Sequence, residues 1–115
     1  MLTQTVKLID INRTVVATAQ VVEQDGKFNG RIDLHLMPVN IQQKFTEYEE
    51  IVNGQMFSFL DEIEEQISEL RLKIRFETGE ERTIDDLQIY PSTKRISFIV
   101  IKETILAAPK EPILV

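Results

Sequence analysis

The chain contains one long stretch in which hydrophobic residues recur every three or four positions. Between residues 39 and 70 they are Ile41, Phe45, Tyr48, Val52, Met56, Phe59, Ile63, Ile67 and Leu70. This spacing places the side chains along one face of an α-helix. Phe57 falls on the opposite side of that helix, and Leu60 lies at the margin of the apolar stripe. The pattern predicts one amphipathic helix over residues 39–70, whose apolar face needs a partner surface.

The residues before this helix alternate with the two-residue period that is typical of strands. We predict strands over residues 3–11, 14–24 and 27–37. Asp25-Gly26 is a signal for a two-residue type I′ turn between the last two strands. If Gln24 pairs with Lys27, the apolar residues of both strands share one face, which supports this register. Gly30 then lies opposite Val21, and we predict a bulge there.

The residues after the helix predict three more strands, over residues 70–77, 81–90 and 95–102. The last is apolar on both faces, as expected for a central strand or one covered by a partner. We therefore predict one α+β domain over residues 1–102 with the order β-β-β-α-β-β-β. Its mostly antiparallel sheet carries one long amphipathic helix packed on one face. Two three-stranded sheets that share the helix are the alternative.

The predicted helix is longer than the sheet that would support it. An unbroken helix over residues 39–70 measures about 48 Å, whereas a strand of ten residues measures about 33 Å. The helix therefore either kinks near Asn53-Gly54, where a mid-helix glycine costs about 1 kcal/mol, or overhangs the sheet. Overhanging apolar surface needs a cover, and a second copy of the chain is the simplest one.

Composition narrows the function classes. The chain has 115 residues, no cysteine and no apolar run long enough for a membrane span. The absence of cysteine excludes disulfides, thiolate zinc sites and thiol nucleophiles. The first residues lack the pattern of a secretory signal. We therefore expect a cytoplasmic protein with no cofactor and no membrane partner.

The net charge of −6 is concentrated in the predicted helix. Residues 39–70 hold eight acidic residues and one basic residue, Lys44, which gives −7; the rest of the chain holds eleven acids and twelve bases, which gives +1. An acidic surface repels phosphate backbones, so we expect no nucleic-acid partner. The acidic face is either plain solvated surface or a docking surface for a basic protein.

Candidate catalytic residues are few. His35 is the only histidine, and an Asp33–His35 pair two residues apart on a strand would lie about 7 Å apart, too far for a direct hydrogen bond. The neighbours in Asp85-Asp86 would point to opposite faces of a strand. We therefore lean toward a protein that is not an enzyme.

Two rows of charge invite a metal or nucleic-acid interpretation. They are Asp61, Glu65 and Glu69 on the helix, and Arg71, Lys73 and Arg75 on the following strand. Carboxylates from one helix face would hold a hard cation only weakly, because real sites collect oxygens from several elements. The basic row is expected to pair with acids on a neighbouring strand, such as Glu81.

The surplus of apolar positions favours a non-catalytic protein-interaction module that self-associates as a homodimer. The residues that would carry the contact are Phe57, Leu60, Ile99, Ile101, Ile113, Leu114 and Val115. The last three belong to residues 103–115, which we expect to be an extended or disordered apolar tail. An unknown protein partner is the other possibility at the same surface.

Two alternatives belong to other functional classes. The first is a small ligand-binding protein or enzyme with a pocket between sheet and helix, where Tyr48, Tyr90 and His35 would supply polar groups. The second is an acidic inhibitor of a basic enzyme, which the charge on the helix favours.

Overall fold

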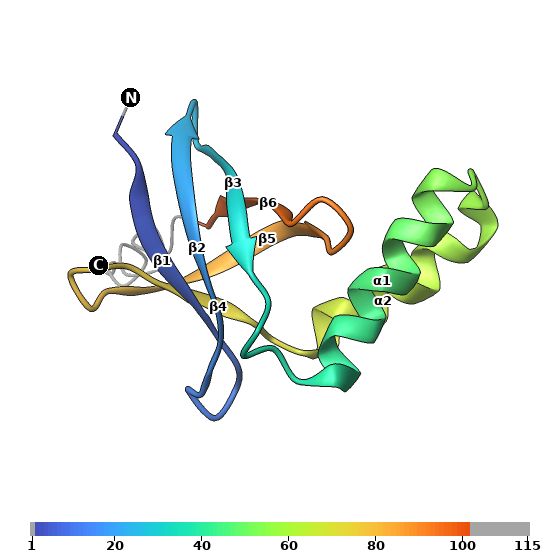
Figure 1. Cartoon of the computed structure of the whole chain (residues 1–115), viewed down its shortest axis with the longest axis horizontal. Coiled ribbons are helices and arrows are strands. Elements are labelled where there is room, and N and C mark those ends of the chain that lie inside the picture. Colours follow the sequence, from blue (N-terminus) through green and yellow to red (C-terminus); the bar gives the residue numbers. More distant parts are fainter. Residues whose placement is uncertain (1, 102–115) are drawn as a thin grey trace, which may run out of the picture.

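The computed structural model describes residues 2–101, which form a closed antiparallel β-barrel and a projecting helical hairpin (Figure 1). The strands are β1 (Gln4–Ile9), β2 (Val15–Gln24), β3 (Lys27–Asp33), β4 (Lys73–Arg75), β5 (Glu81–Tyr90) and β6 (Arg95–Val100). The hairpin consists of α1 (Val39–Asn53), the 3-10 helix η1 (Phe57–Phe59) and α2 (Leu60–Glu69). Around the barrel the strands follow the order β1-β2-β3-β6-β5-β4.

The predicted architecture of an open sheet covered by one long helix is wrong. The strands do occur in the expected order along the chain, but β3 pairs with β6 and β4 pairs with β1. These two long-range pairings close the sheet on itself and leave no open edge at its ends. The inner face of the sheet is therefore covered by the sheet itself, and no helix is needed to cover it. The alternative of two three-stranded sheets is wrong for the same reason.

The β2–β3 hairpin has the predicted register. Gln24 pairs with Lys27, and the pairing continues without a shift to Thr18 and Asp33. Both turn residues, Asp25 and Gly26, have positive φ angles of 55° and 84°, as a type I′ turn requires. The bulge predicted at Gly30 is absent, and β3 ends at Asp33 instead of residue 37.

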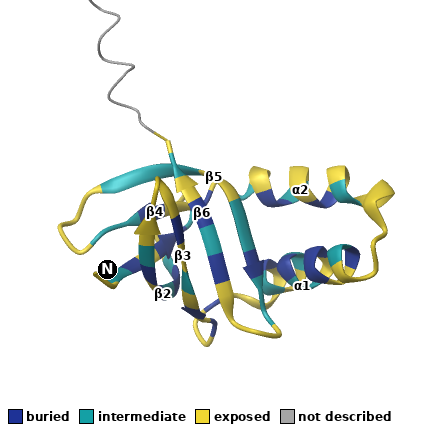
Figure 2. Cartoon of the chain, turned by 90° about the horizontal axis from the view of Figure 1, so that it is seen from above, coloured by how far each residue is buried: buried dark blue, intermediate teal, exposed yellow. Residues whose placement is uncertain are grey.

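Alternate residues of the strands fill the interior of the barrel (Figure 2). They include Val6, Leu8, Ala17, Ala19, Val21, Phe28, Ile32, Ile74, Ile89, Ile96 and Phe98, all of which are buried. Phe28 and Phe98, from the paired strands β3 and β6, stack with their ring centroids 5.0 Å apart. The barrel core is thus closed by contacts between residues distant in sequence.

A bulge in β5 explains why its alternation breaks at Asp85-Asp86. Asp85 pairs with Ile99 and Gln88 pairs with Ser97, so two residues of β5 lie opposite the single residue Phe98 of β6. One of them, Asp86, has a left-handed backbone with φ of 53°. The extra residue leaves both acids exposed, while Leu87 packs against the core.

The segment predicted as one helix folds back on itself. The N–H of Met56 donates to the carbonyl of Ile51 at 3.0 Å, and the N–H of Gln55 donates to Val52 at 3.2 Å. Gln55 has a positive φ of 56°. This pair of bonds around a left-handed residue is the Schellman arrangement that ends a helix. Gly54 keeps a right-handed backbone, so the reversal uses the residue after the glycine.

The two helices bury their apolar stripes against each other, and α1 also packs against β5. Contacts join α1 to α2 and α1 to β5. The buried residues of the hairpin are Ile41, Phe45, Tyr48, Glu49, Ile51, Ile63 and Ile67. The apolar stripe read from the sequence is therefore real, but each half of it covers the other half. The hairpin projects from one end of the barrel, and the long axis of the molecule measures 53 Å (Figure 1).

Candidate functional site

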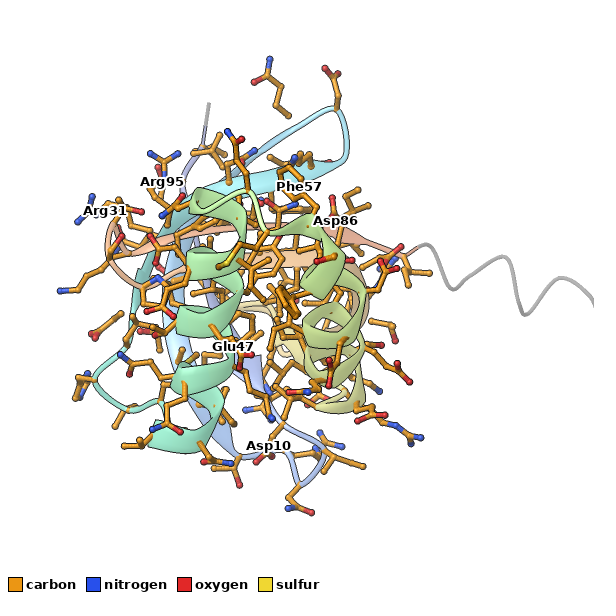
Figure 3. The ribbon with its side chains drawn as sticks, turned by 90° about the vertical axis from the view of Figure 1, so that its right-hand side faces the viewer. Asp10, Arg31, Glu47, Phe57, Asp86 and Arg95 are labelled. Atoms are coloured by element: carbon orange, nitrogen blue, oxygen red, sulfur yellow. The ribbon has the colours of Figure 1, made fainter. Side chains whose placement is uncertain are left out.

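The end of the hairpin farthest from the barrel exposes three large apolar side chains. Met56, Phe57 and Phe59, which we call the tip, are 43%, 58% and 57% exposed (Figures 2 and 3). Exposure of Phe57 agrees with its position opposite the apolar stripe. Met56 and Phe59 belong to that stripe, but the chain reversal removes them from the helix face. Leu60, at the start of α2, is half-buried and packs against the core.

The helices behind the tip carry many acidic residues and one base, Lys44 of α1. Residues 45–70 contain eight acids and no Lys or Arg. Of these acids, only Glu49 is buried. The exposed apolar side chains of the tip therefore lie at the end of a hairpin whose surface is acidic. A surface that combines apolar groups with positive charge would be complementary to it.

Glu49 attaches the hairpin to the barrel. Its carboxylate accepts hydrogen bonds from the backbone N–H of Ser92, at 3.1 Å, and from the Ser92 hydroxyl. Ser92 lies in the turn between β5 and β6, so these bonds join α1 to the barrel. A buried carboxylate needs such donors, since burial of an unpaired charge is costly.

We expect Glu49→Ala to lower the free energy of unfolding by about 2 kcal/mol, because it removes two hydrogen bonds to a charged group. Urea unfolding of the purified protein measures this change. Glu50→Ala is the matched control, since Glu50 is the exposed neighbour, and its effect should stay within about 0.5 kcal/mol. Equal effects of the two substitutions would contradict the role of Glu49 as an attachment point.

A second exposed surface lies on the outside of β3 and β6. Lys27 pairs with Ile99, and Arg31 pairs with Arg95. We call these four residues the basic face. Their neighbours Phe28, Ile96 and Phe98 point into the barrel and are buried, so the four residues project outward. Ile99 is 40% exposed beside Lys27, at the end of the face away from the Arg31–Arg95 pair, and Figure 3 shows Arg31 and Arg95 together on one flank of the barrel.

The remaining residues of the predicted interaction surface have different outcomes. Ile101 follows β6 and is 40% exposed. Its N–H donates to the carbonyl of Thr83 at 2.9 Å, which keeps it beside β5. Ile113, Leu114 and Val115, with the rest of the predicted tail at residues 103–115, lie outside the described residues. Leu60 begins α2, whereas Ile99 lies on β6 and Ile101 follows it, so the residues grouped by the sequence analysis belong to the hairpin and to the barrel.

A cleft of about 650 Å³ lies between α2 and strands β4 and β5. Its apolar lining includes Ile67 and Leu72, and its polar lining includes Tyr48, Arg71 and Asp86. Arg71 and Asp86 both have left-handed backbones, with φ of 52° and 53°. The predicted pocket between sheet and helix therefore has a counterpart, and binding of a ligand there stays a prediction.

The hydroxyl of Tyr48 is the most perturbed polar group beside this cleft. Burial raises the pKa of Tyr48 above the ordinary tyrosine value, and Tyr90, Glu64 and Asp86 raise it further. The two tyrosine rings lie 6.0 Å apart. Tyr90 donates to Gln88 at 3.0 Å, and Gln88 donates to Asp86 at 3.1 Å. These bonds link Tyr90 to Asp86, which lines the cleft, whereas Tyr90 itself does not line it.

We expect Tyr48 to ionise above the usual tyrosine range of about pH 10. The difference between the ultraviolet absorbance titrations of the wild type and Tyr48→Phe measures this ionisation, because the chain has two tyrosines and no tryptophan. Because the folded state holds the Tyr48 proton more tightly than the unfolded state does, the fold keeps its full stability below about pH 10 and loses stability as the pH rises further. Ionisation of Tyr48 at or below pH 10 would contradict the burial of its hydroxyl.

His35 lies outside the cleft lining. Its Nδ1 is 3.1 Å from a carboxylate oxygen of Asp33, and its backbone N–H donates to the same oxygen at 3.0 Å. The predicted separation of 7 Å is wrong, because β3 ends at Asp33 and His35 lies in the following turn. These hydrogen bonds lower the pKa of Asp33. The histidine side chain is 73% exposed, which is typical of a surface turn.

The structure places the two rows of charge as follows. Over residues 2–101, no three His, Cys, Asp or Glu side chains come together as metal ligands would. Arg75 pairs with Glu81 at 3.1 Å, as the sequence predicts. Arg71, which precedes β4, and Lys73 both line the cleft.

Two further observations bear on the class of protein. Within residues 2–101, no helix has both the length and the apolar content needed to cross a membrane. Comparisons of the chain with protein-family models, with curated proteins and with solved structures gave no match in any of the three.

Proposed function

We propose that this protein is a non-catalytic protein-interaction module that self-associates through the tip of its helical hairpin. The observation that carries this proposal is the exposure of Phe57 and Phe59, each by more than half, at the end of the molecule. Large aromatic side chains are frequent anchors of protein interfaces, because they bury much area with little loss of rotamer freedom. Two such rings together with Met56 at one point exceed the single exposed apolar residues that soluble surfaces commonly carry.

The position of the tip supports a binding role over a structural one. The hairpin is attached to the barrel through α1, by contacts with β5 and by Glu49. The tip lies at the opposite end, beyond these contacts (Figure 1). Its side chains can therefore enter a partner surface without disturbing either the barrel core or the attachment. The hairpin thus presents the apolar side chains of the tip on two packed helices.

Light scattering and sedimentation equilibrium of the purified protein test this function. We expect the wild type to form a dimer and Phe57→Ser to raise the dissociation constant at least about tenfold, as removal of an interface anchor does. Gln43→Ser is the control, because Gln43 is an exposed residue of α1 away from the tip. A monomeric wild type, or a dimer that Phe57→Ser leaves unchanged, would overturn self-association through the tip.

A further inference from the structure

We infer that the tip of each copy docks on the basic face of a second copy, so that each chain lays its hairpin on the barrel of the other. This inference rests on the proposed self-association through the tip and adds the surface that receives it. The receiving surface consists of Lys27, Arg31, Arg95 and Ile99 on β3 and β6.

Charge favours this pairing over contact between two hairpins. Residues 45–70 contain eight acids and no base. Two tips in direct contact would therefore bring together two hairpins of like charge, which repel each other. The barrel part of the described chain, residues 2–38 and 71–101, has nine acids and ten bases, a balance of +1. Electrostatic attraction therefore favours contact of the acidic hairpin with the barrel of another copy over contact with its hairpin.

The basic face has the composition that the tip requires. Lys27, Arg31 and Arg95 are exposed, and they make no ion pair with another residue in the described range. Ile99 provides exposed apolar surface beside Lys27. Two acids border the face, because Asp85 pairs with Ile99 and Asp33 ends β3. The face thus offers three positive charges and one exposed apolar side chain to a tip that is apolar and has acidic residues behind it.

A reciprocal arrangement also halves the area that each contact must bury. Stable dimers bury about 1,200–2,000 Å² in total, which is large for three tip residues on one surface. A two-fold axis creates the same contact twice, so each tip needs to bury only about half of that area. The molecule measures 53 × 33 × 29 Å, and its length comes from the projecting hairpin. In the proposed dimer, two antiparallel copies place each hairpin over the partner barrel, and the two-fold axis closes the assembly.

Charge reversal and a mixing experiment test the receiving surface. We expect Arg31→Glu/Arg95→Glu to raise the dissociation constant of the dimer at least tenfold in sedimentation equilibrium. The control is Lys7→Glu/Lys73→Glu, which makes the same change in net charge. These two lysines are exposed on β1 and β4, which lie across the barrel from β3 and β6, so the control dimer should dissociate as the wild type does.

Mixing tests whether the contact is reciprocal. Phe57→Ser keeps an intact basic face, and Arg31→Glu/Arg95→Glu keeps an intact tip. Each variant alone has two defective contacts per dimer, whereas a mixed dimer has one contact that is fully intact. We therefore expect mixed dimers to form at concentrations where each variant alone is monomeric. Labelling one variant with a fluorophore identifies them by fluorescence-detected sedimentation, and circular dichroism shows that each variant is folded.

The outcomes separate this inference from the proposed function. Loss of the dimer in Phe57→Ser, with no effect of Arg31→Glu/Arg95→Glu, would overturn the basic face as the receiving surface and leave the tip as the contact. Sensitivity to both variants without mixed dimers would overturn the reciprocal arrangement. A wild type that stays monomeric would overturn both proposals.

Discussion

Gly30→Ala should destabilise the barrel by about 3 kcal/mol, at the upper end of the usual cost of adding a methyl group to packed structure. A Cβ atom at this position would lie 1.8 Å from the carbonyl oxygen of Gln20 and 2.7 Å from the Cα of Val21. Both atoms belong to the backbone of β2, so no side chain can rotate away to make room. Relief requires the two strands to separate.

The position of Gly30 in the sheet makes that separation costly. Gly30 pairs with Val21 on β2 and with Ile96 on β6, so β3 is held on both sides at this residue. Moving β3 away from β2 would also disturb the β3–β6 pairing, which is one of the two long-range pairings that close the barrel. The glycine therefore serves the close approach of two strands and not the bulge predicted from the sequence.

Urea unfolding followed by circular dichroism measures the effect of Gly30→Ala. Asn29→Ala is the control, because Asn29 is the exposed neighbour on the same strand. Its effect should stay within about 0.5 kcal/mol, as is usual for surface substitutions. If Gly30→Ala unfolds at the same urea concentration as the wild type, β2 and β3 do not approach as closely as the structure has them.

The contrast between the β2–β3 hairpin and the barrel shows which parts of the fold can be read from sequence. The register of that hairpin follows from Asp25-Gly26 and from the alternation of its strands, because both signals are local. The pairing of β3 with β6 joins Lys27 to Ile99, and no local pattern specifies contacts over such a distance in sequence. Closure of the barrel was therefore outside the reach of periodicity.

The helical segment shows a second limit of the same kind. A stripe of apolar residues indicates that one face is buried, but it does not say what covers that face. The choice between one rod and a hairpin depends on Gln55, which takes a left-handed conformation that is uncommon for residues other than glycine. The sequence singled out Gly54, and the chain turns one residue later.

Phe57 is the one residue of the candidate interaction surface whose exposure could be predicted from the sequence. Phe57 falls opposite the helical stripe, which indicated exposure from the sequence alone. Met56 and Phe59 join it because of the chain reversal, and Arg31 meets Arg95 because β3 pairs with β6. These groupings arise from tertiary structure, so the tip and the basic face are assembled by the same non-local contacts that periodicity could not supply.

Two phenylalanines on the hairpin are expected to differ by several kcal/mol in their effects on stability. Phe45 on α1 is fully buried, with 0% exposure, whereas Phe57 is 58% exposed. Phe45→Ala removes a buried aromatic ring and leaves a cavity, which costs about 3–5 kcal/mol. Phe57→Ala removes a ring that is mostly in water, so its cost should stay within about 0.5 kcal/mol. Urea unfolding of both variants under conditions where the protein is monomeric measures the difference.

This comparison separates the hairpin from a single helical rod and tests the basis of the interaction proposal. In a straight helix of the same sequence, Phe45, Met56 and Phe59 would share one buried face, and Phe59→Ala would cost as much as Phe45→Ala. In the hairpin, Phe59 is 57% exposed, and Phe59→Ala should behave as Phe57→Ala does. A large loss of stability in Phe57→Ala or Phe59→Ala would mean that the tip is needed for folding. Near-neutral substitutions there would leave the exposed rings without a role in the stability of a single chain, and binding to another surface is then the role that their chemistry supports.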